Sequence, residues 1–239
     1  MGTHFTSEDH KKEIGNAWIV VPCFNESMVI DQTIDDLSDY FYNILVVDDC
    51  SSDGSQYVLE NRDVVVMKHC INVGQGAALR TGIEYAIDEL GASEVITFDA
   101  DGQHLAQDAA AMLKLLRKKR LDVVLGSRFL TDKRSSIPFR RRLLLQAATS
   151  FTKLSSHIEV TDTHNGLKVF SASAYSKLAL KENRMAHASE MLDEISSKSL
   201  SFLEYQTDIR YTPYSTAKGQ RGSAAFGILF DIILRRFFG

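Results

Sequence analysis

The chain has 239 residues, of which 44% are hydrophobic, and this is enough to bury one substantial core. Its formal net charge of -4 argues against a nucleic-acid-binding protein, because such a protein normally carries a basic face. The three cysteines stand far apart with no CxxC pair, which argues against a disulfide framework or a zinc site and indicates a reduced, cytoplasmic protein.

The two ends of the chain differ in character from its middle. Residues 1–15 are polar and lack the apolar core of a signal peptide, so we expect a flexible tail. We expect one domain over residues 16–222 and an apolar helix over residues 223–239 that meets a membrane surface or a second subunit. No stretch reaches the roughly 20 apolar residues that a transmembrane helix needs.

Apolar runs alternate with segments of helical periodicity up to Gly126. The predicted strands cover residues 17–22, 43–49, 64–69, 94–98 and 122–126. The predicted helices between them cover residues 27–37, 74–90 and 107–119. This alternation indicates βαβ units, and therefore an α/β fold with a mostly parallel, nucleotide-binding sheet flanked by helices.

The alternation breaks after Arg128. We expect helices over residues 138–154 and 189–199 and an extended segment over residues 202–211, without a clear assignment to the sheet.

Polar side chains gather where the predicted strands end, which in a parallel sheet is the edge that binds ligands. They are Asn25, Glu26, Asp48, Asp49, Asn72 and the segment Asp99–His104. Asp99 and Asp101, with the Gln103 amide two residues further on, offer oxygen ligands that suit Mg²⁺ or Mn²⁺. The sequence therefore predicts a divalent metal site that neutralises a diphosphate leaving group.

The segment Asn72–Ala78 opens a predicted helix with two glycines. Two interpretations stay open for it. Free N–H groups at the helix start could approach a phosphate, or the small residues could serve close packing of the helix on the sheet.

Five motifs in order, VPCFNE, VVDDCSSDGS, NVGQGAALRTG, DADGQH and GSRF, resemble the inverting family 2 glycosyltransferases of the GT-A fold. DADGQH and the later DTHNGLKVF (162–170) resemble most the polyprenyl-phosphate glycosyltransferases of the dolichyl-phosphate mannose synthase-like group. The resemblance covers residues 17–170 well and 171–239 more loosely.

The resemblance implies a role for several residues on the donor side. The nucleotide pocket would be lined by Pro22, Phe24, Glu26 and Asp49. Asp99 and Asp101 would face the diphosphate of a UDP- or GDP-linked sugar, with Asp101 and Gln103 as the metal ligands. Two departures from the family pattern are Phe24, where Tyr is usual, and Gln75, where NxGKG has a lysine.

On the acceptor side, the resemblance implies a polyprenyl phosphate and a role in cell-surface glycan synthesis. Arg128 would bind the acceptor phosphate or the sugar diphosphate, and Arg142, within the run 140–142, would contact the lipid phosphate. Lys218, on a polar segment over residues 211–223, would close over the diphosphate. The protein would then lie peripherally at the cytoplasmic face of the membrane, with a homodimer as another use of its C-terminal helix.

A second acceptor remains open at this point, namely a sugar hydroxyl of a lipid-linked saccharide. Such an acceptor requires a carboxylate to remove its proton, and Glu190 or Asp193 is the candidate. Two further alternatives are a nucleotidyltransferase and a non-enzymatic nucleotide-binding or membrane-adaptor module. A nucleotidyltransferase would carry a glycine-rich loop with Arg and Lys after the first strand, where this chain has CFNE. The intact carboxylates at Asp99 and Asp101 argue against a non-enzymatic module.

Overall fold

The computed structural model describes residues 14–130 and 158–210. The predictions for the N-terminal tail, for the helices over residues 138–154 and 223–239, and for Arg142 and Lys218 lie outside these residues. Within them, no helix is long and apolar enough to cross a bilayer.

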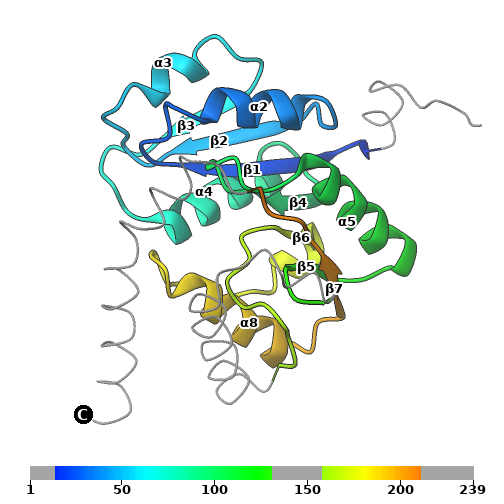
Figure 1. Ribbon diagram of the computed structural model, residues 1–239. Helices are drawn as coiled ribbons and strands as arrows, with labels where there is room; N and C mark the ends of the chain where they lie inside the picture. The colour runs from blue at the N-terminus through cyan, green and yellow to red at the C-terminus, as the bar shows by residue number, and fades with distance from the viewer. Residues whose placement is uncertain (1–13, 131–157, 211–239) are drawn as a thin grey trace, which may run out of the picture.

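The described residues form one seven-stranded sheet in the order β3-β2-β1-β4-β6-β5-β7 (Figure 1). The strands are β1 (Ala17–Cys23), β2 (Ile44–Asp48), β3 (Val65–Lys68), β4 (Glu94–Thr97), β5 (Val123–Ser127), β6 (Lys168–Ser171) and β7 (Phe202–Gln206). Strand β1 pairs in parallel with β2 and β4, β2 with β3, and β5 with β7. The prediction of a mostly parallel sheet is confirmed.

Strand β6 is the exception, because it runs antiparallel between β4 and β5. The sequence pattern predicts no strand between β5 and residue 202, so β6 is a feature that only the structure shows. Its central position places the segment just before it, residues 162–167, beside the carboxyl end of β4.

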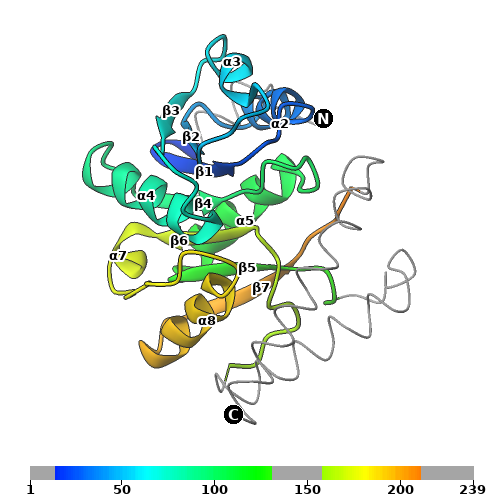
Figure 2. The same ribbon diagram turned by 90° about the vertical axis from the view of Figure 1, so that its left-hand side faces the viewer.

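Helices cover both faces of the sheet, which explains why β1, β2 and β5 are buried along nearly their whole length. The helices are α2 (Ile30–Ser38), α3 (Ser55–Leu59), α4 (Gln75–Asp88), α5 (Ala106–Lys119), α7 (Ala172–Tyr175) and α8 (His187–Ser197). Successive residues of β1 alternate between the faces: Ile19 and Val21 pack with α2 and α5, whereas Val20 packs with α4. Figure 2 shows α4, α7 and α8 on the opposite side of the sheet from α2 and α5.

The predicted helix over residues 27–37 begins later than expected, at Ile30. The residues before it are bound to the loop after β2 instead. The N–H groups of Asn25, Glu26 and Ser27 donate to the side chains of Ser51, Ser55 and Asp53 respectively. These bonds hold the loop after β1 against the loop after β2, at the ligand-binding edge of the sheet.

Candidate active site

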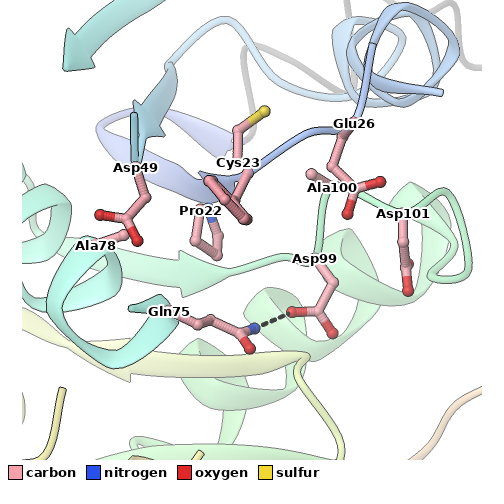
Figure 3. Close-up of a pocket in the computed structure, with 10 residues that line it drawn as sticks. Pro22, Cys23, Glu26, Asp49, Gln75, Ala78, Asp99, Ala100 and Asp101 are labelled. Carbon is pink, nitrogen blue, oxygen red and sulfur yellow. Dashed lines mark hydrogen bonds between the residues drawn. The ribbon is translucent and has the colours of Figure 1, made fainter. Parts of the chain in front are cut away.

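A cleft of about 320 Å³ opens at the carboxyl ends of β1, β2 and β4, a volume within the usual range for a small-molecule site. It is lined by Pro22, Cys23, Phe24, Glu26, Asp49, Gln75, Ala78, Asp99, Ala100 and Asp101. The structure therefore brings together the predicted nucleotide-pocket residues that it describes, whereas Lys218 lies outside the described residues. Figure 3 shows Asp49 at one side of the cleft, Glu26 and Asp101 at the other, and Asp99 with Gln75 between them.

At the first side, the Asp49 carboxylate is held by three donors. The N–H groups of Val73 and Gly74 donate to it over 2.9 and 2.7 Å, and the His69 ring lies 2.7 Å from Oδ1. The other ring nitrogen of His69 contacts the Thr81 hydroxyl at 3.1 Å. Burial acts to raise the pKa of Asp49, but these hydrogen bonds outweigh it and hold the pKa below its ordinary value. This side of the cleft is thus an ionised carboxylate of fixed orientation.

At the other side, the carboxylates of Glu26, Asp99 and Asp101 lie close enough together to affect one another electrostatically. Burial, followed by the charges of Asp99 and Glu26, raises the pKa of Asp101 to about 6. Its Oδ1 accepts a hydrogen bond from the Gln103 N–H at 3.1 Å, which closes the turn after β4. Glu26 is buried at 7% exposure, so its charge is poorly screened by water.

Asp99 lies between the two sides and is oriented by hydrogen bonds to both of its oxygens. The Gln75 amide donates to Oδ1 at 2.9 Å, and Nε2 of His104 lies 3.1 Å from Oδ2. Burial acts to raise the pKa of Asp99, but the His104 hydrogen bond and the charges of Lys168 and His187 lower it further than burial raises it. Gln75, noted in the sequence as a departure from lysine, therefore donates a neutral hydrogen bond to this carboxylate.

The Asp101 side fits a divalent cation. Burial and then the charges of Asp99 and Glu26 disfavour the ionised Asp101 carboxylate, a bound cation would favour it, and oxygen donors are the ligands that Mg²⁺ and Mn²⁺ prefer. Across residues 14–130 and 158–210, no three His, Cys, Asp or Glu side chains are arranged to hold a metal ion by themselves. An ion at Asp101 would need further ligands, and a bound diphosphate offers them.

Gln103, the predicted second metal ligand, does not line the cleft. Its main chain is fixed on both sides, because its N–H donates to Asp101 and its carbonyl accepts from the Arg210 N–H at 2.9 Å. The structure thus places Gln103 beside Asp101, and its role as a ligand stays a prediction.

The glycines that open α4 serve close packing, which supports one of the two interpretations left open by the sequence. A Cβ atom at Gly74 or Gly76 would meet the carbonyl oxygens of Asn183 and Glu182, each at 2.5 Å. The N–H groups of Val73 and Gly74 are already bonded to Asp49. These two N–H groups are therefore not free to bind a phosphate.

Arg128 follows β5 and forms a two-pronged ion pair with Asp162. Its Nε and Nη2 atoms lie 2.6 and 2.7 Å from the two carboxylate oxygens, and both side chains are largely buried. Such a pair fixes the plane of the guanidinium group. Arg128 does not line the donor cleft. The buried Lys168 interacts electrostatically with both Asp162, the partner of Arg128, and Asp99 in the cleft.

Neither candidate base for a hydroxyl acceptor lines the cleft. Both carboxylate oxygens of Glu190 accept hydrogen bonds from main-chain N–H groups, those of Lys181 and Glu182, at 2.8 and 2.9 Å. Asp193 is exposed on α8. Glu190 thus caps the segment that packs on Gly74 and Gly76.

Sequence reasoning missed three residues that shape this site, namely His69, His104 as a partner of Asp99, and Gly166. His69 could have been found, because it follows β3 at the same edge of the sheet as Asp49. Gly166 could not, because its proximity to Asp99 depends on the unpredicted strand β6.

Comparison with known proteins agrees with this geometry. Residues 18–179 match the sequence profile of Glycosyl transferase family 2. An uncharacterised protein of Methanocaldococcus jannaschii is 34% identical over 97% of this chain and 96% of its own length. The UDP-N-acetylglucosamine–dolichyl-phosphate N-acetylglucosaminyltransferase of Methanococcus voltae is 30% identical over 91% of this chain and 94% of its own length.

Among solved structures, glucosyl-3-phosphoglycerate synthase of Mycobacterium tuberculosis, in complex with Mn²⁺, UDP and glucosyl-3-phosphoglycerate, has a TM-score of 0.62 at 17% identity. The match covers 91% of this chain and 81% of that one, and shows that the two share the GT-A fold. Together with the cleft at the carboxyl ends of β1, β2 and β4, the family match makes this chain a glycosyltransferase and a member of family 2.

Proposed function

We propose that the protein transfers a sugar, with inversion, from a nucleoside-diphosphate sugar to a polyprenyl phosphate for cell-surface glycan synthesis. The observation that carries the proposal is the two-sided cleft, with a fixed carboxylate at Asp49 and clustered carboxylates at Glu26 and Asp101. The two parts of such a donor suit the two sides of the cleft: the base can form hydrogen bonds with Asp49, and the charged diphosphate can bind a metal ion beside Asp101. The dolichyl-phosphate acceptor named for the Methanococcus voltae relative supports the choice of acceptor.

In this proposal the nucleoside lies along β1. Pro22 and Phe24, whose side chain is 43% exposed at the cleft, contact the nucleoside, and the Asp49 side of the cleft receives the base or ribose. Asp99 faces the donor between the two sides, where its fixed carboxylate accepts hydrogen bonds from it. Asp49 and Asp99 are both oriented before the donor binds, which reduces the entropy lost on binding.

Asp101, with Gln103 beside it, would hold a Mg²⁺ or Mn²⁺ ion against the diphosphate. Such an ion would neutralise the negative charge that develops on the leaving diphosphate. The chain's own contribution is to keep the Asp101 carboxylate close to Asp99 and Glu26, where negative charge favours a cation.

A phosphate acceptor is already an anion and needs no general base. The hydrogen bonds that both Glu190 oxygens accept from main-chain N–H groups support this acceptor over a sugar hydroxyl. Arg128, aligned by Asp162, would bind the acceptor phosphate, with Arg142 and Lys218 contributing from outside the described residues. We further propose a peripheral location at the cytoplasmic face of the membrane, where the segment 223–239 meets lipid or a second subunit.

The test is a transfer assay with purified protein, Mn²⁺ and labelled UDP- or GDP-linked sugars, starting with UDP-N-acetylglucosamine. Each donor is offered with a polyprenyl phosphate and, separately, with a lipid-linked saccharide. The proposal expects a labelled polyprenyl-phosphate sugar of inverted anomeric configuration. Product only with the saccharide would overturn it and favour the hydroxyl acceptor.

A further inference from the structure

Asp99 touches a third group besides Gln75 and His104, the backbone of Gly166. A Cβ atom built on Gly166 would lie 2.0 Å from Oδ2 of Asp99 and 2.5 Å from its Cγ. Both distances are far below any real contact, so the carboxylate occupies the space that a side chain at position 166 would fill. Asp99 can adopt this orientation only because residue 166 is glycine.

The segment around Gly166 cannot retreat, because hydrogen bonds fix it on both sides. The Thr97 hydroxyl donates to the Gly166 carbonyl at 2.5 Å and accepts from the Lys168 N–H at 3.1 Å. The Leu167 carbonyl accepts from the Gly126 N–H on β5 at 2.9 Å. Thr97 is 2% exposed and ends β4 two residues before Asp99. The same strand end therefore holds both the carboxylate and the glycine against it.

We propose that Gly166 is a positioning residue for the transfer reaction, which orients the Asp99 carboxylate toward the donor by leaving it room. The inference rests on the proposed function in one respect, namely that Asp99 faces the donor sugar diphosphate. A methyl group at position 166 displaces the carboxylate and breaks its hydrogen bond to Gln75 or to His104. Displacement of a positioning group by about 1 Å can reduce turnover about 100-fold.

The test compares Gly166→Ala, Asp99→Ala and the double variant, with Gly82→Ala as the matched control. A Cβ at Gly82 would meet side-chain carbons of Val20 and Val47 at 2.5 and 2.8 Å, which is also a severe steric clash. Gly82 lies in the middle of α4 and does not line the cleft. Gly166→Ala is expected to lower kcat about 100-fold while the affinity for the nucleoside diphosphate alone changes little. Gly82→Ala is expected to lose stability and to keep its turnover per folded molecule.

The double variant carries the decisive comparison. If Gly166 acts through Asp99, the double variant is no less active than Asp99→Ala alone. Wild-type turnover in Gly166→Ala, or losses that multiply in the double variant, would overturn the inference. Should Gly166→Ala fail to fold, the double variant must fold, because the clashing carboxylate is gone; its failure as well would also overturn the inference.

One readout separates this inference from the proposed function. A proton on Nε2 of His104 that is donated to the Asp99 carboxylate would give an NMR signal of its own, and we expect this signal to shift or disappear in Gly166→Ala and to persist in Gly82→Ala. If the wild-type protein transfers sugar to no acceptor but this signal responds as stated, the proposed function fails and the positioning of Asp99 stands. An unchanged signal in Gly166→Ala contradicts the inference whatever the activity.

Discussion

Asp49 and Asp101 lie at opposite sides of one cleft, and the pKa values of their carboxylates are shifted in opposite directions. Asp49 accepts hydrogen bonds from two main-chain N–H groups and contacts His69, and its pKa is lowered. Asp101 sits among other carboxylates, and its pKa is raised to about 6. The Asp49 carboxylate already has its hydrogen-bond donors, whereas in the proposed function a cation balances the charge of the carboxylates around Asp101. In the proposed function, the difference means that the protein preorganises the side that receives the nucleoside, and that the charge of the other side is balanced when the metal and the donor bind.

The strongest way to break this comparison is to neutralise Asp101. Asp101→Asn is expected to reduce kcat/KM about 10³-fold, because the proposed ligand of the cation at the leaving group would be lost. The same change is expected to stabilise the metal-free protein at pH 8 by about 1 to 2 kcal/mol, since a raised pKa means that the ionised form is unfavourable in the fold. Steady-state kinetics and thermal unfolding in EDTA measure the two effects. Asp88→Asn, exposed at the end of α4, serves as the control and should change neither.

At the opposite side, Asp49→Ala is expected to destabilise the protein by about 2 to 3 kcal/mol, because the N–H groups of Val73 and Gly74 lose their acceptor. Binding of the nucleoside diphosphate should weaken as well. Denaturant unfolding and calorimetric titration check both. A variant as stable as the wild type would show that the Asp49 side is not preorganised.

The affinity for Mn²⁺ should depend on pH through Asp101. Protonation competes with the metal, so affinity falls as the pH drops through about 6, to about one tenth at pH 5 of its value at pH 7. The stability of the metal-free fold depends on pH in the opposite direction, and falls as the pH rises. The folded pKa lies above the unfolded value, so the fold binds the proton more tightly, and stability is lost as the pH rises from about 4 to about 6. Calorimetry across this range tests the first point, and a pH-independent Mn²⁺ affinity would contradict it.

The smallest expected effect is that of Glu190→Gln. The amide keeps one acceptor oxygen, so we expect a loss of about 1 kcal/mol in stability and little change in transfer. A fall in kcat of about 100-fold or more, with unchanged stability, is what loss of a general base would cause. That outcome would favour the hydroxyl acceptor.

Much of the fold was predictable, because the parallel strands are continuous apolar runs and the helices between them carry clear apolar faces. The location of Asp49, Asp99 and Asp101 at one edge of the sheet follows from their positions after β2 and β4. Strand β6 was not predictable in this way. It has four residues and follows a long stretch without strand–helix alternation, and its pairing with β4 is set by contacts distant in the sequence.

The same limit applies to the fine structure of the site. The sequence marked Gln75 as a departure and Gly166 as part of a motif, but only the structure shows that both contact Asp99. The glycines of α4 were ambiguous in sequence, because a phosphate and a packed backbone both require a small residue. The close packing becomes evident only from the segment 182–184, more than a hundred residues away.

The most direct test of the two-sided cleft is a crystal structure with Mn²⁺ and UDP, or GDP if thermal-shift measurements show that it binds instead. We expect the anomalous scattering of manganese to give a peak in contact with the Asp101 carboxylate and the diphosphate, with the base on the Asp49 side. A nucleotide bound in the reverse direction, or manganese bound away from Asp101, would contradict the assignment of the two sides.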